Sequence, residues 1–321
     1  MANAKPAAVP AQPCFDPTTP PGGYTWWYAD GLSHDGDYGF TLIAFIGSVF
    51  SPYYAWSGRR DPYNHCAINL ALYGRDRRRW TMTERGRHDL QTDGNSLAIG
   101  PSSLRWDGDT LVIDIAEHGM PVPWPVRGRI RLTPHNLNSE VYKLDSAGLH
   151  SWQPIAPSAA VELEFTEPRL RWRGNGYLDS NRGPSPLEDT FRYWDWSRVH
   201  AEDGRTAILY NTQERNGAER SLCLKFEPDG TCSSFEPPPK AHLPASRIFR
   251  IKRMTRSGSG RGVRLGRTLE DTPFYSRSII ESDILGARAT GMHESFDGDR
   301  LAAPLVKLML PFRMPRRPVQ K

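Results

Sequence analysis

The segment Val161-Glu-Leu-Glu-Phe165 alternates apolar and acidic side chains, and Val126-Arg-Gly-Arg-Ile130-Arg-Leu132 sets arginines against an apolar face in the same way. Successive side chains of a β-strand point to opposite faces, so each segment has one apolar and one charged side. This pattern is typical of strands that cover a core on one face and meet water on the other. Both segments are therefore predicted to be strands.

Turn dipeptides recur between short runs of this kind. Four of them are Asp107-Gly108, Asp203-Gly204, Asn216-Gly217 and Asp229-Gly230. Asp-Gly and Asn-Gly favour the tight turns of β-hairpins. Together with a further strand expected over 110–115, they predict that the chain from about Gly23 to Arg253 is mainly antiparallel β, of sandwich or barrel type.

Two segments break the alternation. Thr41 to Trp56 is the longest apolar run, but it is shorter than the ~20 residues a membrane-spanning helix needs. Its β-branched and aromatic residues favour one or two buried strands. From Ser276 to Phe312 the pattern is mixed, and the apolar residues between Ile279 and Leu285 have helical spacing. A short mixed C-terminal segment is expected.

Length and composition narrow the class of protein. The chain has 321 residues and a net charge of +5, carried by scattered arginines, which argues against a nucleic-acid partner. The four cysteines include no CxxC pair, which indicates reduced thiols. Because the nine histidines are also dispersed, no metal site is predicted. With no apolar leader at the N-terminus, we expect a soluble cytoplasmic protein.

The predicted division of the chain lies where prolines interrupt the strand pattern. Gly183-Pro-Ser-Pro-Leu187 is such a point. The sequence predicts a disordered N-terminal extension over 1–22, one β-domain over 23–187 and a second over 188–321, which ends in a basic, apolar tail.

A polar-aromatic stretch carries the candidate site. His150 and Trp152 are two residues apart, as are Tyr177 and Asp179, so on strands the members of each pair share a face. An acid among rings indicates a dry pocket with a proton source. The alternatives are core packing for each ring and a turn or capping role for Asp179. No P-loop, Gly-x-Ser-x-Gly elbow or His-x-x-x-His pair competes with this interpretation.

Longer strings then bring in a family resemblance. They are Gly22–Tyr28, Ile43–Trp56, Trp80–Arg87, His150–Pro154, Gly176–Asn181, Met292–Ser295 and Met309–Arg316. In these strings the chain resembles the carotenoid 1,2-hydratases of purple photosynthetic bacteria, also called hydroxyneurosporene synthases, over roughly Gly22 to Arg317.

The resemblance implies two lipocalin-like β-domains and addition of water, without a cofactor, across the terminal C1–C2 double bond of acyclic carotenoids such as neurosporene and lycopene. It assigns catalysis to His150, Trp152, Tyr177 and Asp179. Alternatives are a cyclase of the tocopherol type, which traps the same cation with an internal nucleophile, and a lipocalin-like carrier that leaves the carotenoid unchanged. A carbohydrate-active enzyme using the adjacent Glu188 and Asp189 ranks last, because on a strand these acids face opposite sides.

Hydration of a trisubstituted alkene needs a strong acid, and burial can keep a carboxylic acid protonated near neutral pH. Asp179 is the candidate donor. Trp152 is a candidate to stabilise the cation, Tyr177 to orient the acid or the water, and His150 to accept a proton or to bind Asp179; these three roles are interchangeable at this stage. The segment Tyr193-Trp194-Asp195-Trp196 is expected to be the opening strand of the second domain and to contribute wall rather than chemistry.

The substrate is a long polyene dissolved in lipid. We therefore expect peripheral contact with the inner, photosynthetic membrane. The tail Leu305 to Arg317 combines apolar side chains with arginines, as suits an anionic surface. The alternative is a tail packed against the second domain. The oligomeric state is not predicted.

Overall fold

The fold is nearly all β-structure. The computed structural model describes residues 14–74, 78–258 and 262–317. Twelve antiparallel strands form the first sheet of this described part: β1 (Tyr24–Ser33), β2 (Gly39–Ile46), β3 (Cys66–Tyr73), β4 (Arg79–Arg85), β5 (Leu90–Thr92), β6 (Ser96–Ile99), β7 (Ser102–Asp107), β8 (Thr110–His118), β9 (Pro125–Pro134), β10 (Tyr142–Lys143), β11 (Ser151–Glu167) and β12 (Arg169–Gly183).

A second sheet follows in the sequence. Its strands are β13 (Phe191–His200), β14 (Thr206–Glu214), β15 (Glu219–Phe226), β16 (Cys232–Ser234), β19 (Arg264–Asp271), β20 (Tyr275–Ser282) and β21 (Ala289–Asp297). The pair β17 (Lys240–Leu243) and β18 (Arg253–Arg256) forms a separate two-stranded sheet. The order of the second sheet is β16-β15-β14-β13-β21-β20-β19.

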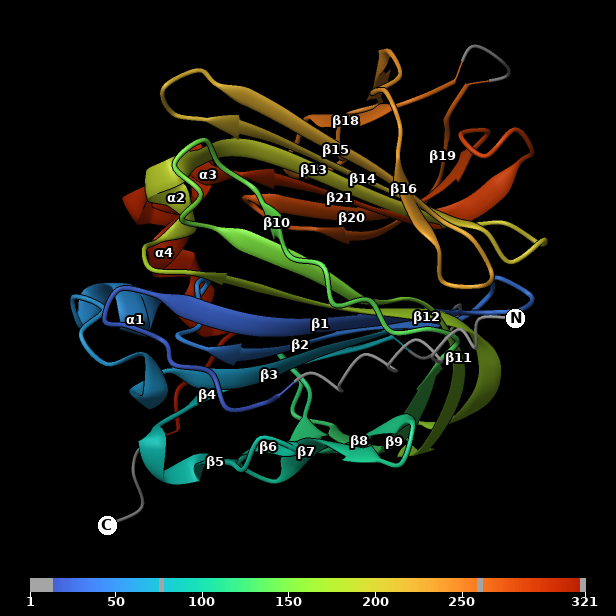
Figure 1. Cartoon of the computed structure of the whole chain (residues 1–321). Helices are drawn as coiled ribbons and strands as arrows, with labels where there is room; N and C mark the ends of the chain where they lie inside the picture. The colour runs from blue at the N-terminus through green and yellow to red at the C-terminus, as the bar shows by residue number, and fades with distance from the viewer. Residues whose placement is uncertain (1–13, 75–77, 259–261, 318–321) are drawn as a thin grey trace, which may run out of the picture.

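The first sheet bends back on itself as a nearly closed barrel. Its order is β4-β3-β2-β1-β12-β11-β9-β8-β7-β6-β5, with β10 beside β11. The long strands β11 and β12 take part in the turn between its two walls (Figure 1). Pro154 and Pro157 lie within the two register shifts where β11 departs from regular pairing with β12. Proline lacks the N–H that a ladder needs, which accounts for irregular pairing there.

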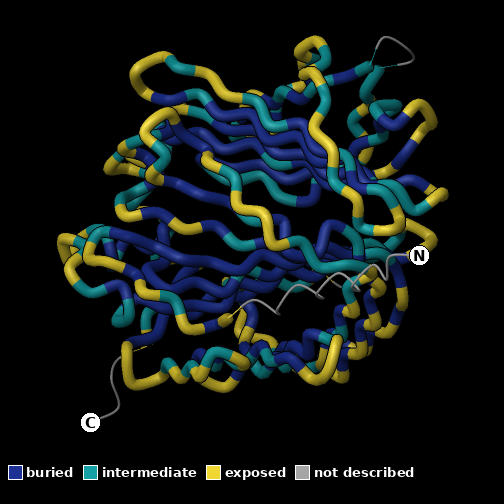
Figure 2. The backbone as a smooth tube through the Cα atoms, in the orientation of Figure 1, coloured by how far each residue is buried: buried dark blue, intermediate teal, exposed yellow. Residues whose placement is uncertain are grey.

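Three layers result. In Figure 1 the second sheet is on top, β1–β4 and β12 lie in the middle, and β5–β9 lie below. One apolar core fills the barrel between the middle and lower layers, and another fills the space between the two sheets. The buried stretches of Figure 2 follow the strands on both sides of the space between the sheets. The middle layer is therefore covered on both faces.

Short helices gather at one end of the molecule (Figure 1). They are α1 (Pro52–Trp56), α2 (Leu187–Thr190), α3 (Gly298–Ala302) and α4 (Pro304–Met309), with 3-10 turns η1 (Pro62–Asn64), η2 (Arg87–Asp89) and η3 (Leu310–Phe312). Glu188 of α2 is 2.7 Å from Arg59 and 3.2 Å from Lys307 of α4. These ion pairs connect α2 with α4 and with the segment around Arg59. They also engage Glu188, one of the two adjacent acids considered for carbohydrate chemistry. No helix of the described residues is both long and apolar enough to cross a bilayer.

The all-β prediction is confirmed, and so are its hairpins. Each of the four Asp-Gly or Asn-Gly dipeptides lies between two consecutive antiparallel strands. The two alternating segments that predict strands pair with each other as β9 and β11. Glu162 faces Arg131 and Glu164 faces Arg129 across this pair, so opposite charges meet on the outer face. The alternation of charged and apolar side chains therefore helps to fix the register of β9 against β11, as well as which face is buried.

Three expectations are wrong in part. Ile279 and Ile280 lie in strand β20, which ends at Ser282, whereas Ile284 and Leu285 lie in the turn that follows, and no helix forms there. This strand is buried on both faces, so it lacks the alternation that would distinguish it from a helix. The run from Thr41 to Trp56 contains one strand and then α1, whose start is capped by the side chain of Ser51.

The third concerns the N-terminal extension. Phe15 is buried in the barrel core, and its backbone N–H donates to Gly94. The predicted disorder over 1–22 is therefore wrong around this residue, while 1–13 lie outside the described residues. The two sheets divide between Gly183 and Phe191; that they are independent domains stays a prediction.

Buried ion pairs and hydrogen bonds join the two sheets. Asp30 of β1 pairs with Arg198 of β13, and both side chains are almost fully buried. Arg277 of β20 donates to the hydroxyls of Thr41 (2.7 Å) and Tyr73 (2.8 Å) on the first sheet. Charges in an apolar layer are costly unless they are paired, so these contacts fix how the sheets face each other.

We expect Arg198→Ala to lower the free energy of unfolding by about 3–5 kcal/mol, because it leaves the Asp30 carboxyl buried without its partner. The double change Asp30→Leu with Arg198→Met should cost less than the single one. Arg127→Ala, at the exposed pair with Glu167, is the matched control and should cost less than about 1 kcal/mol. Urea unfolding measures all three; equal losses at the two arginines would contradict this account.

Candidate active site

Asp179 lies on the face of β12 that meets the second sheet. It is opposite Tyr28 of β1 in the strand register and is only 5% exposed. The indole N–H of Trp152 and the hydroxyl of Tyr177 both donate to its Oδ2, each at 2.9 Å. Oδ1 has no hydrogen-bond partner among the described residues. Three of the four predicted site residues therefore form one hydrogen-bonded group.

Burial raises the pKa of Asp179 well above its usual range, because the layer between the sheets disfavours a charged carboxylate. The hydrogen bonds from Trp152 and Tyr177 oppose this shift, while the charges of Glu294 and Asp30 add to it. No cation is hydrogen-bonded to the carboxyl among the described residues. The surroundings of Asp179 thus favour the neutral form of its carboxyl.

A small cavity adjoins this acid. Both sheets line it, through Trp26, Tyr28, Asp179, Asn181, Trp194, Trp196, Tyr210 and Glu294. Its volume is about 30 Å³, and a buried water needs roughly 10–15 Å³ measured in this way. The cavity therefore has room for water next to the acid, with aromatic rings on most of its remaining wall.

The rings of this wall contact one another across the two sheets. Trp196 lies 5.7 Å from Tyr28 and 5.3 Å from Tyr177, and Tyr210 lies 5.4 Å from Trp152, between ring centroids. The faces of aromatic rings attract positive charge, most strongly where water is excluded. Such a wall suits a reaction that passes through a cation.

Glu294 of β21 brings a second carboxyl to the cavity. It is 2.8 Å from Arg277, so this acid has the cationic partner that Asp179 lacks. Sequence patterns did not single it out as a site residue, although it belongs to one of the strings that carry the family resemblance. Its position follows from pairing between distant strands, a long-range feature that local spacing does not reveal.

His150 lies apart from this group. Its Nδ1 is 2.9 Å from the Tyr24 hydroxyl and its Nε2 is 3.0 Å from Thr190. Burial lowers the pKa of the imidazole, which favours its neutral form. Tyr24 in turn stacks on Trp26 at 4.8 Å, and Trp26 lines the cavity. The structure therefore connects His150 to the site through two rings, without a hydrogen bond to Asp179.

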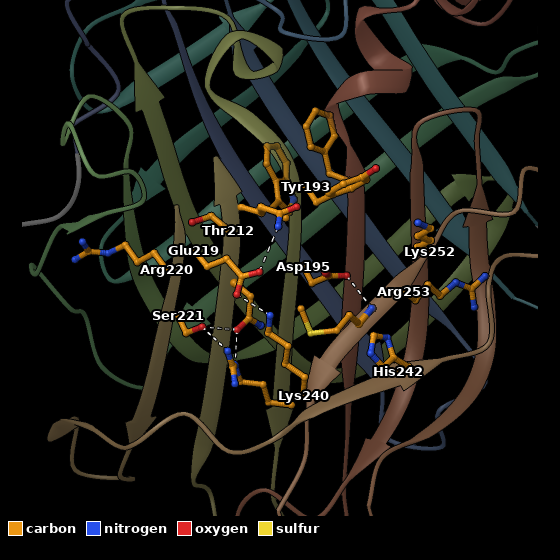
Figure 3. A pocket seen from close by; sticks show the side chains of 16 residues that line it. Tyr193, Asp195, Thr212, Glu219, Arg220, Ser221, Lys240, His242, Lys252 and Arg253 are labelled. Carbon is orange, nitrogen blue, oxygen red and sulfur yellow. Dashed lines mark hydrogen bonds and ion pairs between the residues drawn. The ribbon is translucent and has the colours of Figure 1, made fainter. Parts of the chain in front are cut away.

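The segment around Trp194 divides between two pockets. Trp196 lines only the cavity of Asp179 and Trp194 lines both pockets, whereas Asp195 points to the other face of the second sheet. There it lines a separate pocket of about 190 Å³ beneath β17 and β18, with several basic side chains (Figure 3). Burial raises the pKa of Asp195 to about 7, and Ser295 and the backbone of Met254 donate to it.

The arrangement at Asp179 can perform proton transfer. A neutral acid with one free oxygen, a space for water and an ion-paired carboxylate lie together inside an aromatic enclosure. These are the groups that general acid-base addition to an apolar substrate requires. In the described residues, no group of three or more His, Cys, Asp or Glu side chains is placed to hold a metal ion.

Comparisons with solved structures support the fold. The chain is similar to a candidate AttH from Nitrosomonas europaea, with a TM-score of 0.59 and 14% identity over 86% of this chain and 92% of that one. It is also similar to CghA in complex with Sch210972, with a TM-score of 0.57 and 12% identity over 91% and 96% of the two chains. At this identity the likeness concerns the fold alone.

Sequence relatives are much closer. The chain is 54% identical to the acyclic carotenoid 1,2-hydratase of Thiocapsa roseopersicina, over 95% of this chain and 76% of that protein. The enzyme of the same name from Rubrivivax gelatinosus is 48% identical over the same shares, and that from Cereibacter sphaeroides 41% over 86% and 98%. The family model for the carotenoid hydratase CrtC matches residues 42–321, so this chain belongs to the carotenoid hydratase family.

Proposed function

We propose that this chain adds water across the terminal C1–C2 double bond of acyclic carotenoids such as neurosporene and lycopene, with Asp179 as the proton donor. Its membership of the carotenoid hydratase family supports the reaction. The observation that carries the mechanism is the hydrogen bonding of the Asp179 carboxyl, which is neutral by burial and presents one oxygen without a partner.

The two oxygens of Asp179 have different roles in this proposal. Oδ2 accepts hydrogen bonds from Trp152 and Tyr177, so its lone pairs are engaged. The acidic proton is then carried by Oδ1, beside the cavity. Trp152 and Tyr177 hold the carboxyl in this orientation, and they also stabilise the anion that remains once the proton has left.

The reaction proceeds by protonation and capture. Oδ1 of Asp179 gives its proton to C2, and the π electrons form the new C–H bond, which leaves a tertiary cation at C1. A water oxygen bonds to C1, and the proton it loses passes to the carboxylate of Glu294. Transfer of that proton back to Asp179 through water in the cavity restores both acids. The sum is one alkene plus one water giving one tertiary alcohol.

The cation has a suitable environment in this scheme. Trp26, Trp194 and Trp196 line the cavity, and a desolvated cation over an indole ring gains about 2 kcal/mol or more. The same rings exclude bulk water, so that capture is restricted to a molecule within the cavity. Asn181, which also lines it, supplies an amide to orient that water.

His150 acts in this proposal as a positioning residue. It holds the Tyr24 hydroxyl, and Tyr24 stacks on Trp26 in the cavity wall. Its other nitrogen is engaged by Thr190, next to the start of the second sheet. His150 thus keeps the wall and the neighbouring sheet in register, without touching the reacting atoms.

We further propose that the protein meets its substrate at the surface of the inner, photosynthetic membrane. Leu305, Leu308 and Phe312 are 70%, 61% and 77% exposed, on α4 and η3. Trp56, on α1 at the same end of the molecule, is also largely exposed. A cluster of exposed apolar side chains on short helices suits shallow insertion into the lipid interface.

The arginines of the tail contribute less to docking than the amino-acid composition of the tail suggests. Arg316 pairs with buried Glu84, and Arg313 lies over the Trp80 ring at 4.2 Å. Met314 between them is buried. Residues 313–317 thus pack against the first sheet, while the preceding helix and 3-10 turn present apolar side chains outward.

We expect Asp179→Asn to lower the rate of hydration by about 10²–10⁴-fold, because the amide cannot donate a proton to carbon. Its carbonyl oxygen can still accept from Trp152 and Tyr177, so the fold should persist. Asp195→Asn changes the other buried acid, on the far face of the second sheet, and should leave the rate unchanged. Chromatography of hydroxylated lycopene measures both. Full turnover by Asp179→Asn would remove it as the donor, and unchanged lycopene with the wild type would indicate a carrier.

The pH dependence separates Asp179 from His150. Only the protonated acid donates, so the rate should fall as pH rises through the raised pKa of Asp179. We expect His150→Ala to lower kcat by up to about 10²-fold through misplacement of the wall, without moving this profile. A shift of the profile in His150→Ala, measured across the same buffers, would instead assign the titration to the imidazole.

We expect the triple change Leu305→Gln, Leu308→Gln and Phe312→Gln to weaken binding to liposomes at least about tenfold, because each apolar side chain loses its transfer from water to lipid. The exposed Val141→Gln is the control and should bind like wild type. Point changes are preferable to truncation, since removing the tail would also expose Glu84. Equal flotation of the triple variant and the wild type would contradict docking by this surface.

A further inference from the structure

We infer that a large apolar cavity between the two sheets, beneath η3, holds the polyene chain of the carotenoid while its end lies at Asp179. This inference rests on the proposed function, since it names the place of the same substrate. The cavity has a volume of about 460 Å³, and none of the residues assigned to catalysis lines it. It is a second site, for binding rather than for chemistry.

The chemistry of its wall fits a hydrocarbon. Ile43, Phe50, Met82, Phe274, Leu310 and Met314 are among the residues that line it. Its charged residues have partners: Arg277 pairs with Glu270 and Glu294, Arg313 lies over the Trp80 ring, and Asp271 accepts from Ser246. The amide of Asn69 donates to the backbone at Thr81. An apolar void of this size loses packing contacts throughout its lining, which favours an apolar occupant.

Two rows of rings connect this cavity with the one at Asp179. On the first sheet Trp26 lies 6.1 Å from Phe45, which lies 5.7 Å from Phe50. Trp26 lines the small cavity and Phe50 lines the large one. The middle ring, Phe45, is paired directly with Trp26 in the strand register.

The second sheet carries a matching row. Trp194 stacks on Phe296 at 4.0 Å, and Phe296 lies 6.4 Å from Phe274. Trp194 belongs to the small cavity and Phe274 to the large one, as on the facing sheet. The two rows meet where Phe50 and Phe274 are 5.3 Å apart. Packed rings thus mark the course between the two cavities, which share no lining residue, and a polyene that followed it would displace some of these rings.

This course crosses the strands rather than following them. Asp179 is on β12, and the large cavity reaches β2, β3 and β4, which follow β1 in the sheet order. Four strand spacings of roughly 4.8 Å give a path of about 19 Å. An extended polyene laid along it would have its terminal alkene at the acid and its chain among the rings.

The outer end of the course opens where docking is proposed. Met309, Leu310 and Phe312 line the large cavity, and Phe312 is also the most exposed large apolar side chain on this surface. A carotenoid leaving lipid at α4 and η3 would thus enter the cavity directly. The part of the chain that is not enclosed would stay in the bilayer.

Binding of lycopene can be measured without turnover in the Asp179→Asn background. Lycopene is achiral, so circular dichroism in its absorption band reports lycopene held in a protein site. We expect the added change Ile43→Trp to raise the Kd at least about tenfold, because the larger ring fills the cavity, and Ile43→Phe to have a smaller effect. Val141→Trp adds the same ring at an exposed position outside both cavities and should not change the Kd.

Thermal unfolding of each variant checks that the protein is folded at the temperature of measurement, and Ile43→Phe supplies a milder change should Ile43→Trp be unstable. Unchanged affinity in folded Ile43→Phe and Ile43→Trp would overturn the cavity as the polyene site while leaving the proposed reaction in place. Absence of any lycopene signal in both the wild type and the Asp179→Asn parent would overturn the carotenoid substrate itself, and the cavity proposal with it.

Discussion

The dryness of the layer between the two sheets determines the chemistry that its acids can perform. Burial raises the pKa of Asp30 even though Arg198 pairs with it, which shows how strongly this layer disfavours charge. Asp179 lies in the same layer with only neutral donors, from Trp152 and Tyr177. Burial without a cationic partner favours the protonated form of such a carboxyl, and this is what the proposed role of Asp179 as a proton donor requires.

The same layer explains why two sheets are needed. The barrel core lies on the other side of the middle layer and contains none of the residues that line the cavity at Asp179. The first sheet supplies the acid and its two donors, and the second supplies Glu294, Tyr210 and the two tryptophans of β13. Neither sheet alone encloses the cavity. The buried contacts of Arg198 and Arg277 across the layer are therefore part of the site as well as of the fold.

The sequence predicted those site residues that lie on one strand or on the strand directly beside it. Tyr177 and Asp179 share a face of one strand, and Trp152 follows from the neighbouring strand, where it is paired with Asn181. His150 precedes β11, and extending the register places it beside Gly183, four residues from Asp179 and roughly 13 Å along the strand. The two-residue spacing correctly indicated a shared face but not proximity. Glu294 and Tyr210 could not be predicted in this way, because strand order brings them to the site from more than thirty residues further along the chain.

The proposed addition of water depends on a pair of acids in different environments. Asp179 and Glu294 line one small cavity from opposite sheets, yet only Glu294 has an arginine beside it. Arg277 is itself held by Thr41 and Tyr73 of the first sheet, so the partner that distinguishes the two acids is fixed by the contact between the sheets. A shift of one sheet against the other would disturb both the enclosure of Asp179 and the ion pair of Glu294. The proposed donor and the proposed acceptor of the proton thus both depend on a single feature, the way in which the two sheets meet.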